Sequence, residues 1–206
     1  MSDAAKARPR IALTFDDGPA EATNRVLDVL EATRAKATFF VVGERVADYV
    51  SELRRIAAGG FQIGNHTWHH EYISRIPEEE LRVVLARTND AIREACGVTP
   101  VVMRPPGEFW SDDALAVLGD MGFPAVFWNV DPRDWKTRDA QSTIDYVLEN
   151  VADGDIIIMH DLYQPTADAA EVIVPELISR GYELLTVDEL ARSRGGMRPG
   201  ERYYHF

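Results

Sequence analysis

Strand-like and helix-like segments alternate along almost the whole of this 206-residue chain. Short apolar runs are typical of buried strands, and longer segments with apolar residues every three or four positions are typical of helices. We predict helices over residues 44–58, 77–96, 111–121, 139–151 and 187–194, and a further helix that follows residue 161 and ends at Arg180. We expect Thr23 to cap an earlier helix. We predict strands over residues 10–15, 37–42, 61–65, 101–103, 124–130, 155–159 and 183–187.

This alternation predicts an α/β protein with a parallel sheet and helices outside it. We expect a parallel (β/α) barrel of about seven strands in a single domain, and an open doubly wound sheet is the second choice. No linker-like stretch or internal repeat divides the chain. We expect the domain to span residues 10–194, with residues 1–9 disordered or tag-like and residues 195–206 forming an irregular tail.

The charge of the chain limits its partners. The sequence has 34 Asp and Glu residues against 22 Lys and Arg residues, which gives a net charge of -12. It has no basic face of the kind that nucleic acids or anionic membranes need, so we expect no nucleic-acid partner. A neutral or cationic substrate fits better, although net charge does not fix the charge of a local cleft. Nothing in the sequence implies a protein partner.

Cys96 is the only cysteine, so the chain cannot form an internal disulfide. Its place near the end of a predicted helix favours a buried structural thiol over a nucleophile. No apolar stretch approaches about 18 residues, so we expect no membrane span. Residues 1–10 lack the apolar core of a signal peptide. We therefore expect either a cytoplasmic protein or an exported one whose signal has been removed, and the sequence does not separate these.

Unusual polar residues come directly after the predicted strands. In a parallel barrel the carboxyl ends of all strands open on one face, which is where active sites lie. We therefore expect polar clusters that are far apart in the sequence to meet at this face.

The first of these clusters is a pair of adjacent carboxylates, Asp16 and Asp17, before a turn that Gly18 and Pro19 impose. Two neighbouring buried carboxylates repel each other, so one must be protonated or a positive group must compensate them. A bound metal ion would hold one carboxylate and leave the other free as a base. The alternative is an ordinary surface turn, for which Asp-Asp-Gly-Pro is also suitable.

The second cluster contains His66 and His70, whose spacing of four places both imidazoles on one side of a helical turn. Two neutral imidazoles and the Asp17 carboxylate suit zinc or another first-row divalent ion. Three protein ligands leave a position open for water, as in catalytic zinc sites. We expect His69 to face away. The alternative for the pair is two surface histidines.

The other polar residues predict an acid and a base. Asp16 is placed to take a proton from water, and His160 could return one to a leaving group. A buried guanidinium must be paired, so we expect Arg104 to pair with Asp16 and hold it ionised. Asp134 could orient His160 and stabilise its charge. A strand-end histidine without a catalytic role is the alternative for His160.

Two further residues could shape the pocket. Trp135 would form an apolar wall, although a tryptophan is more often a core residue. Gly107 leaves its backbone N–H open to approach, which suits contact with an oxyanion. A simple loop glycine is an equally good interpretation.

Five motifs stand in a fixed order: TFDDGP at 14–19, HTWHH at 66–70, RPPG at 104–107, DPRDW at 131–135 and IMHD at 158–161. In order and spacing they resemble the polysaccharide deacetylases, carbohydrate esterase family four. The resemblance extends from about residue 11 to residue 190. It implies a distorted (β/α) barrel with fewer than eight strands. It also implies metal-dependent hydrolysis of N-acetyl groups on amino sugars or of O-acetyl groups on xylan.

The resemblance also implies a role for each candidate residue. Asp16 is the base, His160 is the acid, Arg104 orients the base and Asp134 tunes the acid. Three residues hold a divalent metal, most simply zinc, with cobalt, nickel or manganese as alternatives: Asp17, His66 and His70. Trp135 and Ile158 shape the acetate pocket.

Two positions depart from the family pattern. The family usually has an aromatic residue where Gly107 stands, and Phe109 or Trp110 could fill that space. It usually has leucine where Ile158 stands, a conservative change in volume. Neither change touches the metal ligands or the acid–base pair, so both concern substrate preference.

The sequence thus predicts a metal-dependent deacetylase acting on glycans that contain N-acetylglucosamine, either chitooligosaccharide or peptidoglycan. The first alternative is an acetylxylan O-acetyl esterase with the same site. Two histidines and an aspartate also suit a non-haem iron oxygenase, but a base beside the ligand and a separate acid favour hydrolysis. A sugar-binding module without catalysis would need a lost ligand or acid, and none is missing.

Overall fold

The computed structural model describes residues 8–206, so the predicted segment 1–9 lies almost wholly outside the described residues. The strands are β1 (Arg10–Asp16), β2 (Thr38–Val41), β3 (Gln62–Asn65), β4 (Ala125–Val126), β5 (Ile156–His160), β6 (Glu183–Leu185) and β7 (Arg202–Tyr203). The α-helices are α1 (Thr23–Thr33), α2 (Val50–Ala58), α3 (Glu78–Cys96), α4 (Asp112–Asp120), α5 (Asp134–Thr137), α6 (Ala140–Asn150), α7 (Gln164–Ser179) and α8 (Val187–Arg192).

Strand β1 is the centre of a parallel sheet with the order β3-β2-β1-β5, and β6 pairs with the beginning of β1. Isolated parallel bridges continue this sheet from Asn65 to Met103, from Met103 to Ala125, and from Val130 to Ile157 of β5. Strands and bridges together form an irregular ring, which confirms the predicted distorted α/β barrel in a single domain.

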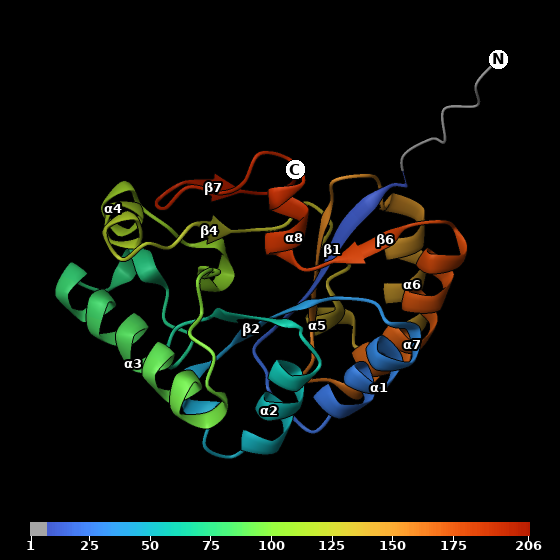
Figure 1. The fold of residues 1–206 in the computed structure, drawn as a ribbon, viewed down its shortest axis with the longest axis horizontal. Coiled ribbons are helices and arrows are strands. Elements are labelled where there is room, and N and C mark those ends of the chain that lie inside the picture. Colours follow the sequence, from blue (N-terminus) through green and yellow to red (C-terminus); the bar gives the residue numbers. More distant parts are fainter. Residues whose placement is uncertain (1–7) are drawn as a thin grey trace.

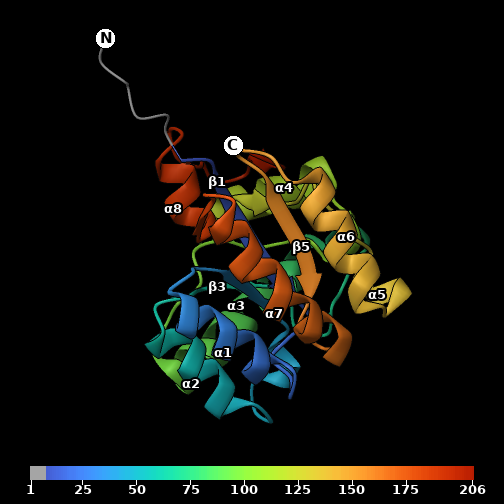
Figure 2. The same cartoon turned by 90° about the vertical axis from the view of Figure 1, so that its right-hand side faces the viewer.

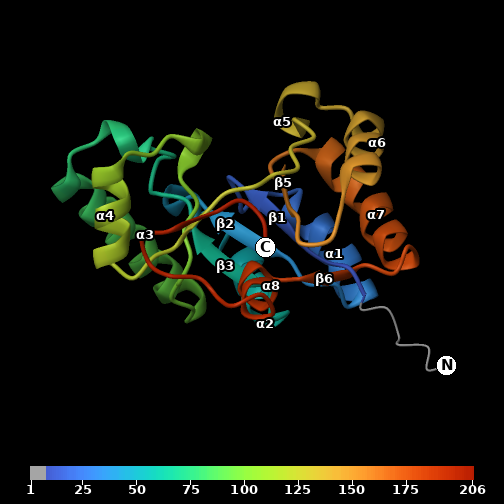
Figure 3. The ribbon, with the colours of Figure 1, turned by 90° about the horizontal axis from the view of Figure 1, so that it is seen from above.

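The helices lie outside the strands. Figures 1 and 3 show α3 and α4 on one side of the sheet and α5, α6 and α7 on the other. Figure 2 shows α7 between α1 and α6, and α7 contacts both of them. No helix in residues 8–206 is both long enough and apolar enough to cross a membrane.

Alternation along β1 decides which of its residues reach the inside of the ring. Ile11, Leu13 and Phe15 belong to the largest apolar cluster, together with side chains of α1 and α7. Because successive strand residues point to opposite faces, Thr14 and Asp16 point the other way, toward the interior of the barrel. The period of the strand therefore places the first aspartate inside and leaves its neighbour Asp17 at the rim.

Several predicted elements differ from the observed ones. The predicted strand 101–103 is reduced to a bridge at Met103, because the flanking Pro100 and Pro105 lack the N–H groups that a ladder needs. Within 124–130 only β4 and the bridge at Val130 are regular. The tail at 195–206 includes the short strand β7, which pairs with β4.

Two other predictions are corrected at the helices. The predicted helix 44–58 is a short 3-10 turn at Gly43–Arg45 followed by α2, since the N–H groups of Gly43 and Glu44 bond to carbonyls of Thr67 and Trp68 instead. Thr23 does not cap α1, because the cap position is Ala22. The Thr23 hydroxyl instead accepts the N–H of Ala20 and donates to Asp161.

Gly64 in β3 allows Phe40 to approach the strand closely. A Cβ at position 64 would lie 2.4 Å from Phe40 Cδ1, and the Phe40 ring lies 4.1 Å from the Arg104 guanidinium. We expect Gly64→Ala to lower the free energy of unfolding by about 1–3 kcal/mol, because it overpacks this layer. Urea unfolding measures the effect.

Gly119 in α4 provides the matched control, because a Cβ there would make only ordinary contacts, the nearest at 3.5 Å. Gly119→Ala is expected to raise stability by about 0.4–1 kcal/mol. Similar losses in the two variants would contradict the overpacking argument.

Candidate active site

The carboxyl ends of the strands and the loops after them surround one cavity of about 350 Å³. Its walls come from distant parts of the sequence: Asp16, Asp17, His66, His70, Tyr72, Gly107, Trp128, Asp131, Trp135, Ile158, His160 and Tyr163. Eight of the ten predicted site residues are among them, so the expected convergence takes place. The other two, Arg104 and Asp134, are buried behind the wall, where each contacts a residue that does line the cavity.

Arg104 is fully buried and reaches Asp16 from the interior of the barrel. Its Nη1 donates to Asp16 Oδ1 and to Thr14 Oγ1, each at 2.7 Å, while Nε and Nη2 donate to backbone carbonyls of Val126 and Phe127. Burial lowers the pKa of Arg104, and the adjacent Asp16 charge partly offsets this. The pairing predicted between Arg104 and Asp16 is therefore present in the structure.

Asp17, His66 and His70 offer three ligand atoms that all lie within 4.8 Å of one another. Asp17 Oδ1 is 3.3 Å from Nε2 of both histidines, and it is buried without a hydrogen-bond partner. Burial alone would raise the pKa of Asp17, but the nearby imidazoles hold it below its usual value. Burial lowers the pKa of His70, which favours the neutral form that binds metals.

This group fits a divalent cation. Ligands about 2.0–2.1 Å from a tetrahedral ion are about 3.3 Å apart, which matches the distances from Asp17 to the two histidines. His66 Nδ1–H donates to the Arg104 carbonyl at 2.8 Å, so Nε2 keeps its lone pair for the site. The described residues thus contain a candidate metal site with a preset histidine tautomer.

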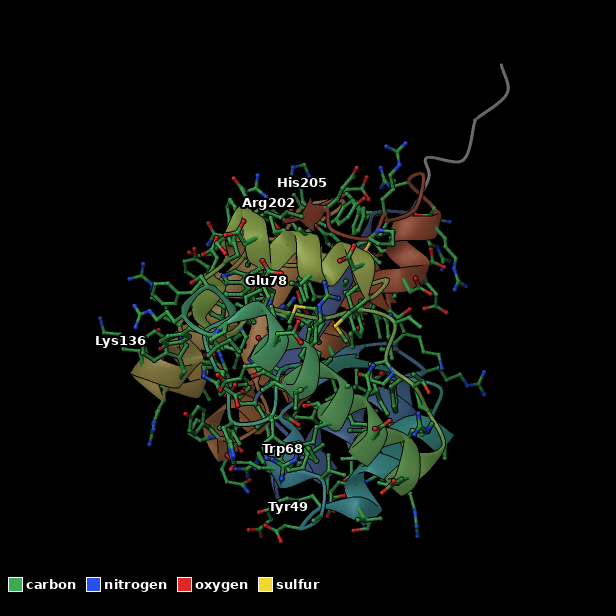
Figure 4. All side chains as sticks on the ribbon, turned by 90° about the vertical axis from the view of Figure 1, so that its left-hand side faces the viewer. Tyr49, Trp68, Glu78, Lys136, Arg202 and His205 are labelled. Atoms are coloured by element: carbon green, nitrogen blue, oxygen red, sulfur yellow. The ribbon has the colours of Figure 1, made fainter. Side chains whose placement is uncertain are left out.

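The loop that carries both histidines is fixed by polar side chains. Asn65 Oδ1 accepts the N–H of Thr67, and Glu71 Oε2 accepts the N–H groups of Trp68 and His69. The imidazole of His69 points away to an exposed ion pair with Glu44 at 2.6 Å, as expected. Trp68 and the remaining histidine, His205, lie toward opposite ends of the molecule (Figure 4).

His160 and Asp134 form a second buried pair. Asp134 Oδ1 lies 2.8 Å from His160 Nδ1, and Oδ2 accepts the His160 backbone N–H and the hydroxyl of Thr166. Burial opposes the charged imidazolium, but the Asp134 hydrogen bond and charge raise the pKa of His160 to about 9. His160 therefore carries a proton at neutral pH, and its ring faces the cavity.

The rim residues differ in exposure. Ile158 is buried, whereas Trp135 is 48% exposed at the start of α5. Gly107 has a positive φ of 62°, and a Cβ there would lie 2.9 Å from the Tyr72 ring. The rings of Tyr72 and Phe109 are tilted by 44° with centroids 4.6 Å apart, and they occupy the space beside Gly107. Trp110 packs against the apolar cluster that contains Leu115 and Phe127.

Four cavity residues were not predicted: Tyr72, Trp128, Asp131 and Tyr163. Tyr72 follows the predicted ligand His70 by two residues, and Tyr163 follows the predicted acid His160 by three. Asp131 is the first residue of the DPRDW motif, in which Asp134 is the predicted site residue. Asp131 directly follows the predicted strand 124–130 and Tyr163 follows the predicted strand 155–159 by four residues, which was the available signal for these two, whereas Trp128 lies inside a predicted strand. Cys96 is only partly buried, and its thiol donates to the Ile92 carbonyl.

Comparison with known proteins matches residues 3–126 to the family model described as "Polysaccharide deacetylase". The chain belongs to the polysaccharide deacetylase family. It is 40% identical over 181 residues to the peptidoglycan-N-acetylmuramic acid deacetylase PdaC of Bacillus subtilis. The matched residues are 87% of this chain and 38% of PdaC. The chain thus spans less than half the length of this relative.

Two other members of the family match over most of both chains. A chitooligosaccharide deacetylase of Bradyrhizobium is 37% identical over 194 residues, covering 86% of this chain and 89% of that protein. The structure of a family 4 acetyl xylan esterase from Clostridium thermocellum, in complex with a cobalt ion, superposes with a TM-score of 0.88. It is 35% identical and covers 95% of this chain and 98% of its own.

Removal of one candidate ligand tests the metal site. We expect zinc to bind the chelator-treated protein at one ion per chain, and His66→Ala to weaken binding by about 100-fold or more. Isothermal titration calorimetry measures both affinities. His69→Ala is the matched control, because that side chain is exposed and paired with Glu44. An equal loss in the two variants would disprove the ligand assignment.

The His160–Asp134 pair predicts a pH dependence. In the metal-free protein we expect His160 to titrate near pH 9, and Asp134→Asn to lower its pKa, because the hydrogen bond and charge of Asp134 no longer oppose the effect of burial. Because the folded pKa is raised, the pair's contribution to stability is complete below pH 6.5 and is lost as pH rises through 9. Histidine NMR titration measures the pKa, and an unchanged pKa in the variant would contradict this account.

Proposed function

We propose that this protein is a metal-dependent deacetylase that hydrolyses N-acetyl groups of glycans containing N-acetylglucosamine and releases acetate. The observation that carries the proposal is the meeting of one charge-paired aspartate, one protonated histidine and three candidate ligands around a single cavity. The names of the related deacetylases support it. An acetylated glycan, chitooligosaccharide or peptidoglycan, is accordingly the proposed substrate.

The proposed ligands are Asp17, His66 and His70, and zinc is the proposed ion, with cobalt, nickel or manganese as alternatives. The unpartnered Asp17 oxygen and the 3.3 Å spacings support this set. A divalent cation held there supplies Lewis-acid polarisation of the acetyl carbonyl and a lowered pKa for water.

The proposed base is Asp16. In this scheme it takes a proton from the attacking water, and the water oxygen forms a bond to the acetyl carbon. Arg104 holds the carboxylate in place with a 2.7 Å hydrogen bond and supplies its counter-charge. The other carboxylate oxygen lies 3.8 Å from His66 Nε2, so the base stands beside the candidate ligands.

The proposed acid is His160. As the carbon–nitrogen bond breaks, it gives a proton to the sugar nitrogen, and the products are acetate and an amine. Asp134 orients the ring through Nδ1, which leaves Nε2 as the proton donor. The Gly107 N–H is the proposed donor to the oxyanion, and Trp135 and Ile158 are proposed to enclose the acetyl methyl group.

The alternative function is an O-acetyl esterase acting on xylan, which the similarity to the acetyl xylan esterase structure supports. An amine leaves a tetrahedral intermediate only after it is protonated, whereas an alkoxide depends less on an acid. Asp134 is hydrogen-bonded to His160 and raises the pKa of this imidazole, so a proton donor faces the cavity, and this supports the amide substrate.

An acetate-release screen tests the proposal. We expect the protein to release acetate from N-acetylated chitooligosaccharide or peptidoglycan strands faster than from acetylxylan, and a chelator to stop the reaction. We expect Asp16→Asn to lower kcat by about 100-fold or more while zinc affinity is kept, because the base is lost and the ligands remain.

Two controls make this screen decisive. Zinc binding of Asp16→Asn, measured by calorimetry, separates loss of the base from loss of the metal. Near-normal turnover in Asp16→Asn would show that another group is the base. Faster release from acetylxylan than from every N-acetylated strand would favour the esterase.

A further inference from the structure

Asp161 is a buried carboxyl group that the proposed reaction does not use. It follows His160 at the end of β5 and is 1% exposed, behind the wall of the cavity. Its Oδ2 accepts the hydroxyl of Thr23, whereas within residues 8–206 its Oδ1 has no hydrogen-bond partner. An unpaired buried oxygen costs about 1–3 kcal/mol, which an apolar side chain of similar size would avoid. Asp161 therefore calls for a role other than filling space.

The sheet brings this carboxyl group next to the turn that follows Asp17. Asp16 in β1 and His160 in β5 are partners in the parallel register. The residues that follow them, Asp17 and Asp161, therefore leave the sheet from neighbouring strands. A Cβ at Gly18 would lie 2.4 Å from both carboxyl oxygens of Asp161, so the turn packs directly on this side chain.

This close approach explains the glycine at position 18. Gly18 does not have a positive φ, so its φ would also suit alanine. The three atoms nearest to a Cβ there all belong to the Asp161 carboxyl group. Asp161 is therefore the reason that no side chain fits at this position.

Asp161 also reaches the other end of the turn, through Thr23. The Ala20 N–H donates to Thr23 Oγ1 at 2.8 Å, and the same hydroxyl donates to Asp161. The Gly18 carbonyl accepts the N–H of Val42 at 3.0 Å. The turn is thus held between a residue that follows β5 and a residue that follows β2.

We propose that Asp161 is a positioning residue, which fixes the turn after Asp17 and thereby aims the Asp17 carboxylate at the bound cation. This inference rests on the metal site of the proposed function, and it adds a residue that neither binds the ion nor transfers a proton. Asp17 has a φ of 70°, which costs a non-glycine residue free energy, so an unsupported turn would relax. Holding Gly18 in place keeps Asp17 Oδ1 3.3 Å from Nε2 of both His66 and His70.

Zinc affinity and amide exchange test this role apart from turnover. We expect Asp161→Ala to weaken zinc binding by about 10-fold or more in isothermal titration calorimetry, as loss of a residue that orients a ligand does. In the metal-free variant we expect the Val42 amide to exchange at least about tenfold faster than the change in global stability explains, because its acceptor Gly18 is no longer held. Asp161→Asn should stay within about threefold of wild type in both measurements, because the amide has the same shape and still accepts the Thr23 hydroxyl.

A double variant links the effect to the contact with Gly18. Gly18→Ala alone should weaken zinc binding, since its Cβ would collide with the Asp161 carboxyl group. Gly18→Ala combined with Asp161→Ala should bind zinc no more weakly than Asp161→Ala alone, because the new methyl group occupies the vacated space. Additive losses in the double variant would show that the two residues act independently and would overturn the proposed contact.

Asp155→Ala is the matched control. Asp155 is also a buried aspartate, but it lies just before β5, at the opposite end of the strand from Asp161. It accepts N–H groups of Ala152 and of the Asn129 side chain. This variant should lose stability in urea unfolding and keep the zinc affinity of wild type. Equal losses of zinc affinity in Asp155→Ala and Asp161→Ala would reduce Asp161 to a general structural role.

The outcomes separate this inference from the function it rests on. Unchanged Val42 exchange in Asp161→Ala overturns the inference even if the wild-type protein binds zinc and releases acetate. A wild-type protein that binds no zinc overturns the proposed function, and the exchange rates then still decide whether Asp161 holds the turn.

Discussion

The buried ion pair between Arg104 and Asp16 is the interaction on which the rest of the site depends. Burying two charges is costly, and removing one partner from such a pair typically costs about 3–5 kcal/mol. Arg104 offsets this cost by donating to Thr14 in β1 and to carbonyls of Val126 and Phe127 at β4. On this side the ring is held only by isolated bridges. One side chain therefore fixes the proposed base and also ties the barrel together where its backbone ladder is weakest.

The ligand loops are held in backbone conformations that they would not adopt alone. Asp17, Thr67 and His70 have φ values of 70°, 63° and 61°, in the left-handed region that costs a non-glycine residue about 1 kcal/mol or more. Glu71 offsets part of this strain by accepting two N–H groups of the histidine loop. Burial raises the pKa of Glu71, but the backbone N–H groups bring it below its usual value. The candidate metal ligands on the histidine loop are thus preorganised by the Glu71 side chain, which does not line the cavity.

The sequence predicts most of the barrel and most of the site for one reason. Parallel strands place all their carboxyl ends on one face, so residues that follow strands converge even when strand boundaries are uncertain. The features that the sequence does not predict depend on tertiary contacts, which leave no periodic pattern in the sequence. Strand β7 has only two residues and α5 only four. The hydroxyl of Thr23 donates a hydrogen bond to Asp161 instead of capping α1. Tyr72 and Tyr163 line the cavity because of how their loops pack, which residue type alone does not determine.

Three buried aspartates near the cavity show how surroundings decide what a carboxylate can do. Asp16 contacts a guanidinium, and this leaves it a hydrogen-bonded carboxylate beside the ligands. Within residues 8–206 no cationic group forms an ion pair with Asp161, and burial raises its pKa to about 7. Asp17 is also largely buried, yet its pKa falls because two imidazoles face the same unpartnered oxygen. Of these three aspartates, only Asp17 combines a negative charge, two nearby imidazole nitrogens and an oxygen without a partner. A cation would bind the oxygen and both nitrogens at the same time.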